Sequence, residues 1–69
     1  MPLVLLTAGE TARICRIGGS DDLRARLAEL GFVVGEQVTV VSALADNLIL
    51  QVKGSRIALG QDMARHIMI

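Results

Sequence analysis

Hydrophobic and polar positions alternate along most of the chain, and this alternation is typical of half-buried β-strands. It is present in residues 11–17, 37–42, 48–53, 56–59 and 65–69, with turn-forming residues between most of these segments. Short strands spaced about ten residues apart are typical of a small barrel or a strongly bent sheet. The pattern therefore predicts a mainly β protein of about five short strands.

One segment, between the first and second predicted strands, has helical rather than strand periodicity. Its apolar side chains recur at i, i+4 and i+7 and form a single stripe of Leu23, Leu27 and Leu30. Ser20 or Asp21 is a suitable N-cap, because either side chain can accept a hydrogen bond from a free backbone N–H. A helix of about ten residues is too short to persist alone in water, so we expect its stripe to cover one open end of the barrel.

The same segment carries a stop signal at its end. Gly31 can adopt the positive φ that other residues resist, and Leu30 would then be the C-cap residue. In a Schellman stop of this kind, Phe32 at C″ contacts Leu27 at C3. We therefore expect the helix to end at Leu30 and the chain to turn at once towards the next strand.

The ends of the chain and two turns complete the predicted fold. The apolar run Pro2–Leu6 fits either a buried strand or an extended N-terminal segment, because periodicity alone does not separate the two. Residues 45–47 and 53–55 are turn signals, and residues 60–64 resemble a single helical or 3-10 turn. The predicted fold is a small barrel with one helix inserted after the first long strand and a short helical turn near the C-terminus.

The composition predicts more apolar side chain than one small core can hide. The 69 residues suffice for a single domain spanning 1–69, and 52% of them are hydrophobic. A chain of this size buries only about 60% of the surface that its unfolded form exposes. We therefore expect an exposed apolar patch, which usually marks a partner surface or a self-association surface.

Charge and cysteine content narrow the classes of function. Seven basic and seven acidic residues give a formal net charge of zero without a basic stripe, so we do not expect nucleic acid as a partner. The single cysteine, Cys15, excludes an internal disulfide framework and fits a reducing cytosol. The apolar runs are far shorter than the roughly 18 residues that span a bilayer, so we expect no direct membrane insertion.

Candidate chemistry is sparse. The side chains that could bind a soft metal are His66, Met63 and Cys15, but a specific site needs three or four converging ligands. A partly exposed structural histidine is the preferred interpretation of His66. Gly18-Gly19 lacks the Lys-Ser/Thr of a phosphate-binding loop, and no base is apparent for Cys15 as a nucleophile. We therefore expect neither an enzyme nor a bound cofactor.

Three blocks in the chain carry a resemblance to a known family. Residues 26–40, RLAELGFVVGEQVTV, resemble the pattern R-L-x-x-L-G-F-x-x-G-x-x-V-x-V of FeoA, the small ferrous iron transport protein. Residues 52–67, VKGSRIALGQDMARHI, resemble that family's ending V-x-G-x-x-I-A-L-x-x-x-M-A-x-x-I. Residues 6–14, LTAGETARI, resemble its opening L-x-x-G-x-x-A-x-I. Together the blocks cover nearly the whole chain in the family's order.

The resemblance implies more than the periodicity does. FeoA-like domains are SH3-like small β-barrels with a helical insertion, cytosolic and non-enzymatic. Their implied partner is FeoB, the membrane ferrous-iron transporter with a cytosolic GTP-binding domain. The same domain follows the DNA-binding and dimerisation domains of DtxR-type repressors, and this chain has no room for a helix-turn-helix. From Met1 and the full set of predicted strands we expect a whole protein and not a fragment.

The expected function is that of a cytosolic accessory protein that binds and modulates FeoB. The contact surface that we expect consists of the outer side of the helix and the turn Leu59–Met63. Its residues are Arg24, Arg26, Ala28, Leu59, Asp62 and Met63. Two alternatives stay open. One is a self-assembling structural module whose apolar patch forms a homo-oligomer, and the other is an iron-responsive metal-binding domain of the kind found in DtxR-type repressors.

Overall fold

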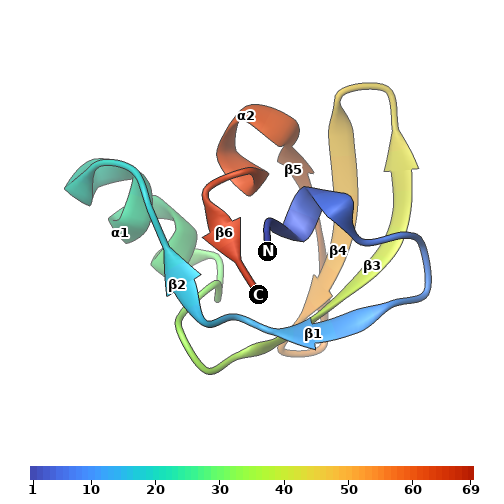
Figure 1. Ribbon diagram of the computed structural model, residues 1–69, viewed down its shortest axis with the longest axis horizontal. Helices are drawn as coiled ribbons and strands as arrows, with labels where there is room; N and C mark the ends of the chain where they lie inside the picture. Colours follow the sequence, from blue (N-terminus) through green and yellow to red (C-terminus); the bar gives the residue numbers. More distant parts are fainter.

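The computed structural model describes all residues of the chain, 1–69, and it is mainly β, as the periodicity predicts (Figure 1). Helices are few and short. The elements in chain order are η1 (Leu3–Leu5), β1 (Thr11–Arg13), β2 (Arg16–Ile17), α1 (Asp21–Glu29), β3 (Gln37–Leu44), β4 (Asn47–Val52), β5 (Ser55–Gly60), α2 (Gln61–Ala64) and β6 (Ile67–Met68). The helix inserted after the first predicted strand, residues 11–17, and the helical turn near the C-terminus are therefore both confirmed.

Two antiparallel sheets make up the fold. The larger sheet has the strand order β1-β3-β4-β5, and the smaller sheet pairs β2 with β6. Two-residue turns join β3 to β4 and β4 to β5, as the turn signals predict. In the second turn Lys53 and Gly54 both have positive φ, +50° and +78°, which is the type I′ geometry that fits the twist of a hairpin.

The predicted strand 11–17 is divided into β1 and β2, because its pairing partner changes in the middle. Ile14 exchanges hydrogen bonds with the β3 side of the fold, donating to Glu36 O at 2.9 Å and accepting from Gly35 N at 2.8 Å. The N–H of Cys15 donates instead to the carbonyl oxygen of Met68 in β6, at 2.8 Å. Successive residues of an extended chain point their hydrogen-bonding groups to opposite edges, so this segment connects the two sheets at a corner.

The core is formed by the alternating inward positions of the strands and by a few residues outside them. Inward positions of β4 and of the first half of β3 are no more than 3% exposed, whereas the end of β3, after a register shift between Val40 and Ser42, is more exposed. Because every second residue points inward, the alternation seen in the sequence identifies this face correctly. The buried hydrophobic residues are Leu3, Ile14, Leu27, Phe32, Val38, Val40, Leu48, Leu50, Val52, Leu59, Ala64 and Ile67.

The N-terminal apolar run is neither a strand nor an extended segment but the 3-10 helix η1. Leu5 N–H donates to Pro2 O and Leu6 N–H donates to Leu3 O, at 3.1 and 3.0 Å. Only Leu3 of the run is fully buried, whereas Leu5 is 63% exposed, so a tight turn that inserts one side chain replaces the predicted strand. Pro2 additionally forms an isolated bridge with Met68 of β6.

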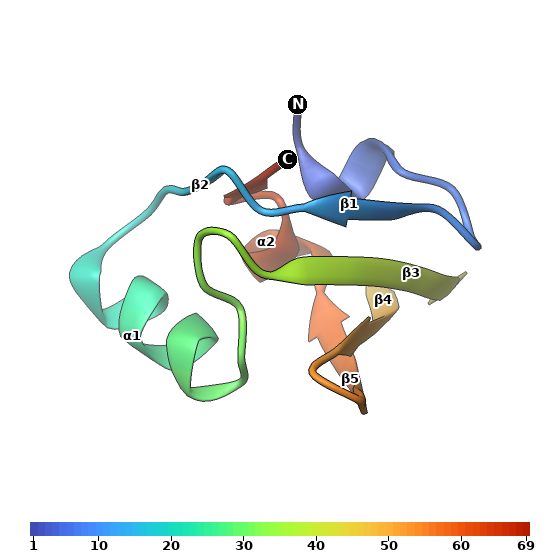
Figure 2. The same cartoon turned by 90° about the horizontal axis from the view of Figure 1, so that it is seen from below.

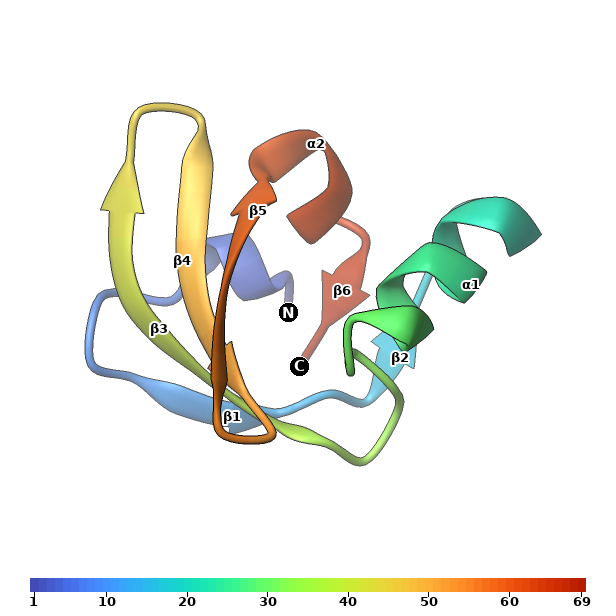
Figure 3. The same cartoon turned by 180° about the vertical axis from the view of Figure 1, so that it is seen from behind.

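Helix α1 covers the core less extensively than its leucine stripe predicts. Leu27 is fully buried and Leu23 is half-buried, but Leu30 is 41% exposed because it lies at the C-cap, where the chain leaves the helix. Figures 1 and 3 show α1 at one side of the molecule next to β2, whereas η1 and α2 lie next to the large sheet. Figure 2 shows the same arrangement from below, with the α1–β3 connection running back towards the large sheet. Of the expected three-leucine lid, Leu27 and Leu23 pack against the core as predicted, but Leu30 does not, and Phe32 just after the helix is buried in the core as well.

Candidate partner-binding surface

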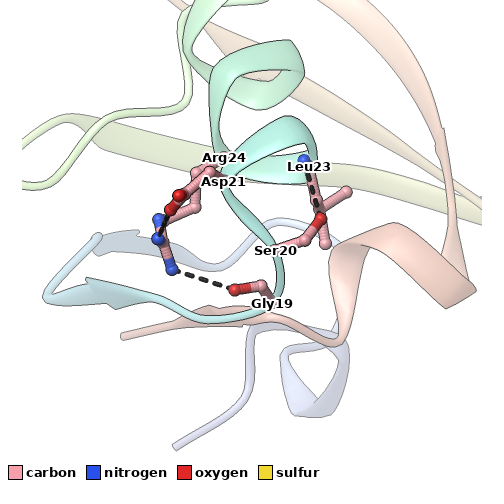
Figure 4. A network of polar contacts seen from close by, with 5 residues as sticks. All are labelled: Gly19, Ser20, Asp21, Leu23 and Arg24. Atoms are coloured by element: carbon pink, nitrogen blue, oxygen red, sulfur yellow. Dashed lines mark hydrogen bonds and ion pairs between the residues drawn. The ribbon is translucent and has the colours of Figure 1, made fainter.

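The start of α1 is held by a small polar network within the chain (Figure 4). Leu23 N–H donates to Ser20 Oγ at 3.1 Å, so Ser20 is the N-cap residue. The guanidinium of Arg24 donates to Gly19 O at 2.9 Å and forms an ion pair with Asp21. Arg24, which sequence analysis places in the contact surface, is thus already engaged in capping the helix.

The outer face of α1 remains open to solvent beyond this network. Arg26 and Ala28, the other two predicted contact residues on the helix, are both exposed. Arg26 forms no ion pair and no side-chain hydrogen bond, in contrast to Arg24. It lies in the last turn, where a positive charge interacts favourably with the negative end of the helix dipole. Arg26 is therefore the free cation of this face.

The connection from α1 to β3 exposes large apolar side chains that sequence analysis did not assign to the surface. They are Leu30, Val33 and Val34, which are 41%, 36% and 64% exposed. The turn of residues 33–36 is closed by the Glu36 N–H, which donates to Val33 O at 3.1 Å, and Gly35 has φ +92°. This geometry matches a type II turn, with Val34 at the tip.

This turn is fixed to the rest of the fold. The guanidinium of Arg13 donates to Gly35 O at 2.6 Å, and the Gly35 N–H donates to Ile14 O at 2.8 Å. The two exposed valines are therefore carried on a braced turn next to the end of α1. The sequence signal for these exposed side chains is the apolar run of residues 32–34 before Gly35.

The predicted contact residues around α2 differ in accessibility. Leu59 is 3% exposed and belongs to the core, so its assignment to the contact surface is wrong. The inward parity of β5 directs its side chain away from solvent. Asp62 is exposed in the first turn of α2, and Met63 is half-buried against the core. Figures 1 and 3 show α1 and α2 as separate helices, so the exposed predicted residues fall into two groups, one on each helix.

The three candidate metal ligands lie in the C-terminal part of the fold and at its corner. Cys15 is exposed, and Met63 and His66 are half-buried, with the His66 N–H donating to Met63 O at 3.1 Å. The imidazole of His66 packs beside Gly19, where an added Cβ would lie 3.5 Å from the ring. No group of three or more His, Cys, Asp or Glu side chains is arranged to hold a metal ion.

One carboxylate has a clearly perturbed titration, at the turn before β1. Hydrogen bonds from the backbone N–H of Thr7, and from its hydroxyl, lower the pKa of Glu10 below its ordinary value of 4.5. The two donors lie 2.7 and 2.8 Å from Glu10 Oε1. Both bonds stabilise the charged carboxylate, which accounts for the direction of the shift. Glu10 thus closes the loop that leads into β1.

The strongly bent antiparallel fold, with short helices beside it, places the chain among SH3-like small β-domains. The family model of the FeoA domain matches residues 1–69, and the chain belongs to the FeoA family, which is associated with ferrous iron transport. None of the curated proteins matches the chain. No helix has the length and apolar character needed to traverse a lipid bilayer.

Solved structures of FeoA proteins have the same fold. The iron uptake regulatory protein FeoA is 27% identical, with a TM-score of 0.91, over 97% of this chain and 89% of that chain. FeoA of Stenotrophomonas maltophilia, crystallised with zinc, is 31% identical with a TM-score of 0.82, over 99% of this chain and 87% of that one. That protein is described as a prokaryotic SH3 domain protein with a suggested role as a ferrous iron transport activating factor.

A longer protein contains a similar unit. IdeR of T. acidophilum is 30% identical to this chain with a TM-score of 0.87, over 99% of this chain. The chain spans only 32% of the length of IdeR, so the similarity covers one part of that protein.

Proposed function

We propose that this protein is a cytosolic, non-enzymatic accessory protein of bacterial ferrous iron uptake, and that it binds FeoB and modulates its activity. The observation that carries the proposal is the match of the whole chain to the FeoA family. The suggested role of the Stenotrophomonas maltophilia protein as a ferrous iron transport activating factor supports it. An effect on a transporter needs a surface that recognises another protein, and the exposed residues of α1 and its C-terminal connection offer one.

The contact surface that we propose combines charge with exposed apolar area. Arg26 and Ala28 present the polar and small side chains of α1, and Leu30, Val33 and Val34 extend this region with apolar side chains. Arginine is enriched at the energetic centre of protein interfaces, and the buried core of an interface is more apolar than the surface around it. Because the turn at Val34 is braced, its side chains lose little freedom on binding. Asp62 and Met63 on α2 are a second, separate contact group in this proposal.

The proposal is tested by measuring ferrous iron uptake in cells that lack this gene. We expect uptake to fall under iron limitation, to recover with the wild-type chain, and to recover less with Arg26→Glu. The matched control is Arg16→Glu, which makes the same charge change at an exposed residue of β2. Uptake that is unchanged by deletion under strict iron limitation would contradict the proposal.

Two alternatives have a specific observation in their favour. Exposed Leu30, Val33 and Val34 would also suit a homo-oligomer, and sedimentation at high protein concentration distinguishes this, because a strict monomer excludes it. The zinc complex of the Stenotrophomonas maltophilia FeoA favours an iron-responsive metal-binding domain. Anaerobic calorimetry with Fe²⁺ or Mn²⁺ tests that alternative, since a titration without heat of binding excludes it.

A further inference from the structure

Strand β5 forms an open edge of the large sheet. It pairs antiparallel with β4 along its whole length, from Val52 opposite Ser55 to Asn47 opposite Gly60. No strand lies on its other side, because the order of the sheet ends at β5. Strand β1 is the opposite edge, but it has only three residues and its continuation at Cys15 pairs with Met68. The six-residue strand β5 is therefore the longer free edge.

The backbone groups that face outward on β5 follow from the turn before it. In a two-residue type I′ hairpin the residues flanking the turn, Val52 and Ser55, form a hydrogen-bonded pair. Hydrogen-bonded pairs then recur at every second residue, so Ile57 and Leu59 also bond to β4. The N–H and C=O groups of the residues between them, Arg56 and Ala58, point away from β4.

Nothing else in the chain pairs with these outward groups. The backbone hydrogen bonds outside the regular elements include none from or to Arg56 or Ala58, and no side chain bonds to either. Both residues are exposed. An open edge with free N–H and C=O groups is a template for an added strand from another polypeptide.

The side chains along this edge select the kind of strand that would pair. Arg56 has no ion pair, so a carboxylate placed opposite it would neutralise an uncompensated cation. Ala58 lies opposite half-buried Ile49 on β4. Because the side chain of Ala58 is small, an apolar side chain of an added strand has room beside it. Pairing of β5 with a second copy would place two Arg56 residues on one edge with no carboxylate, because residues 55–60 contain no Asp or Glu. The charge therefore favours a different, acidic partner.

We propose that β5 is a docking edge on which an extended segment of the partner protein, with a carboxylate and an apolar residue in alternation, adds as a strand. The proposal rests on the proposed function, since FeoB is the partner that would supply this segment. It deepens that function by assigning main-chain hydrogen bonds at Arg56 and Ala58 to the contact, in addition to side chains of α1.

Amide hydrogen exchange tests the proposal residue by residue. In the free protein, we expect the amides of Arg56 and Ala58 to exchange rapidly and those of Ile57 and Leu59 slowly. With full-length FeoB in nanodiscs, the first two should become protected. Binding that protects other residues while Arg56 and Ala58 exchange as before would overturn the docking edge and leave the proposed function intact. Absence of any binding would contradict the proposed function and the docking edge together.

Two variants separate backbone from side-chain effects. Ala58→Pro removes only an outward N–H, and proline is tolerated on edge strands, so the β4–β5 pairing should persist in the amide spectrum. We expect affinity to fall on the order of tenfold for the lost hydrogen bond. Arg56→Glu should weaken binding and reduce its salt dependence, whereas Arg65→Glu, the same charge change at exposed Arg65 after α2, should not. Unchanged affinity in folded Ala58→Pro, or protection of the edge by self-association alone, would overturn the proposal.

Discussion

The backbone N–H of Phe32 donates a hydrogen bond of 2.9 Å to the carbonyl of Leu27, and the side chains of both residues are completely buried. Gly31 between them has φ +105°, and its N–H donates to Ala28 O at 3.0 Å. These two bonds define a Schellman stop, as the residue pattern predicts. These bonds tie the end of α1 to the core. Leu30, just before Gly31, and Val33, just after Phe32, are the neighbouring residues whose side chains remain exposed.

Leu27→Ala should destabilise the protein by about 2–5 kcal/mol, because it removes a fully buried side chain and leaves a cavity. The matched control is Leu30→Ala, at the 41% exposed C-cap residue, for which we expect a change below about 1 kcal/mol. Urea unfolding followed by circular dichroism measures both. Equal losses in the two variants would mean that Leu30, and not Leu27 alone, supports the helix.

Gly31→Val should be damaging, because a β-branched residue at φ +105° is a conformational outlier. An added Cβ would meet Val52 and Lys53 side-chain atoms at 3.6 Å, which is ordinary contact, so the cost arises in the backbone. We expect a loss of at least about 1–2 kcal/mol in thermal or urea unfolding. Gly54→Asn is the control, since Gly54 has φ +78°, no atom lies within 4 Å of its added Cβ, and asparagine tolerates such turns. A fully stable Gly31→Val would contradict the helix stop.

The stability of the protein should fall on acidification through Glu10. Its carboxylate has a lower pKa in the folded state than the ordinary value of 4.5, so the unfolded state binds the proton more readily. The contribution is present above pH 4.5 and is lost as the pH falls below that value through the folded pKa. Urea midpoints measured between pH 7 and pH 3 should show this decrease.

Two variants isolate the Glu10 effect. Glu10→Gln has no titrating group and should lose less stability than the wild type between pH 7 and pH 3. Thr7→Val keeps the backbone donor but removes the hydroxyl that donates at 2.8 Å, so the pKa of Glu10 should be lowered less than in the wild type. Chemical shifts of the Glu10 side chain report this pKa directly. A Glu10 pKa at or above 4.5 in the wild type would refute the assigned hydrogen bonds.

The two arginines of α1 should differ in their effects. Arg24→Gln removes the bonds to Gly19 and Asp21 at the helix start, and we expect a loss of up to about 1 kcal/mol in stability, as for other exposed ion pairs. Arg26→Gln breaks no hydrogen bond and loses only the interaction with the helix dipole, so we expect a smaller loss of about 0.3 kcal/mol together with weaker binding to FeoB. Urea unfolding and a binding titration on the same samples measure the two effects. A stable Arg24→Gln and a destabilised Arg26→Gln would reverse these roles.

The sequence predicts the strands and their inward faces well, because alternation depends only on local geometry. The helix stop at Gly31 was equally accessible, since a Schellman stop is defined by a few adjacent residues. The pairing partners of residues 11–17 could not be predicted in this way. Nothing in this segment indicates that Ile14 bonds towards β3 and Cys15 towards β6. Such a division depends on segments more than 20 residues away along the chain, such as Glu36 and Met68.

The candidate surface was only partly predictable. Exposed Arg26 and Ala28 follow from helical periodicity, but Leu59 was placed on the surface although the alternation of its own strand directs it inward. The braced turn at Val34 depends on Arg13, which donates to Gly35 O from another part of the chain. Tertiary contacts of this kind decide which apolar residues remain exposed, and a local pattern does not contain them.

The most direct measurement for this account is the equilibrium binding of the purified chain to full-length FeoB in nanodiscs, titrated without nucleotide, with GDP and with a non-hydrolysable GTP analogue. We predict saturable binding in at least one nucleotide state, weakened by Arg26→Glu and unaffected by Arg16→Glu. No saturable binding in any of the three states, with a folded chain and an active transporter, would contradict it.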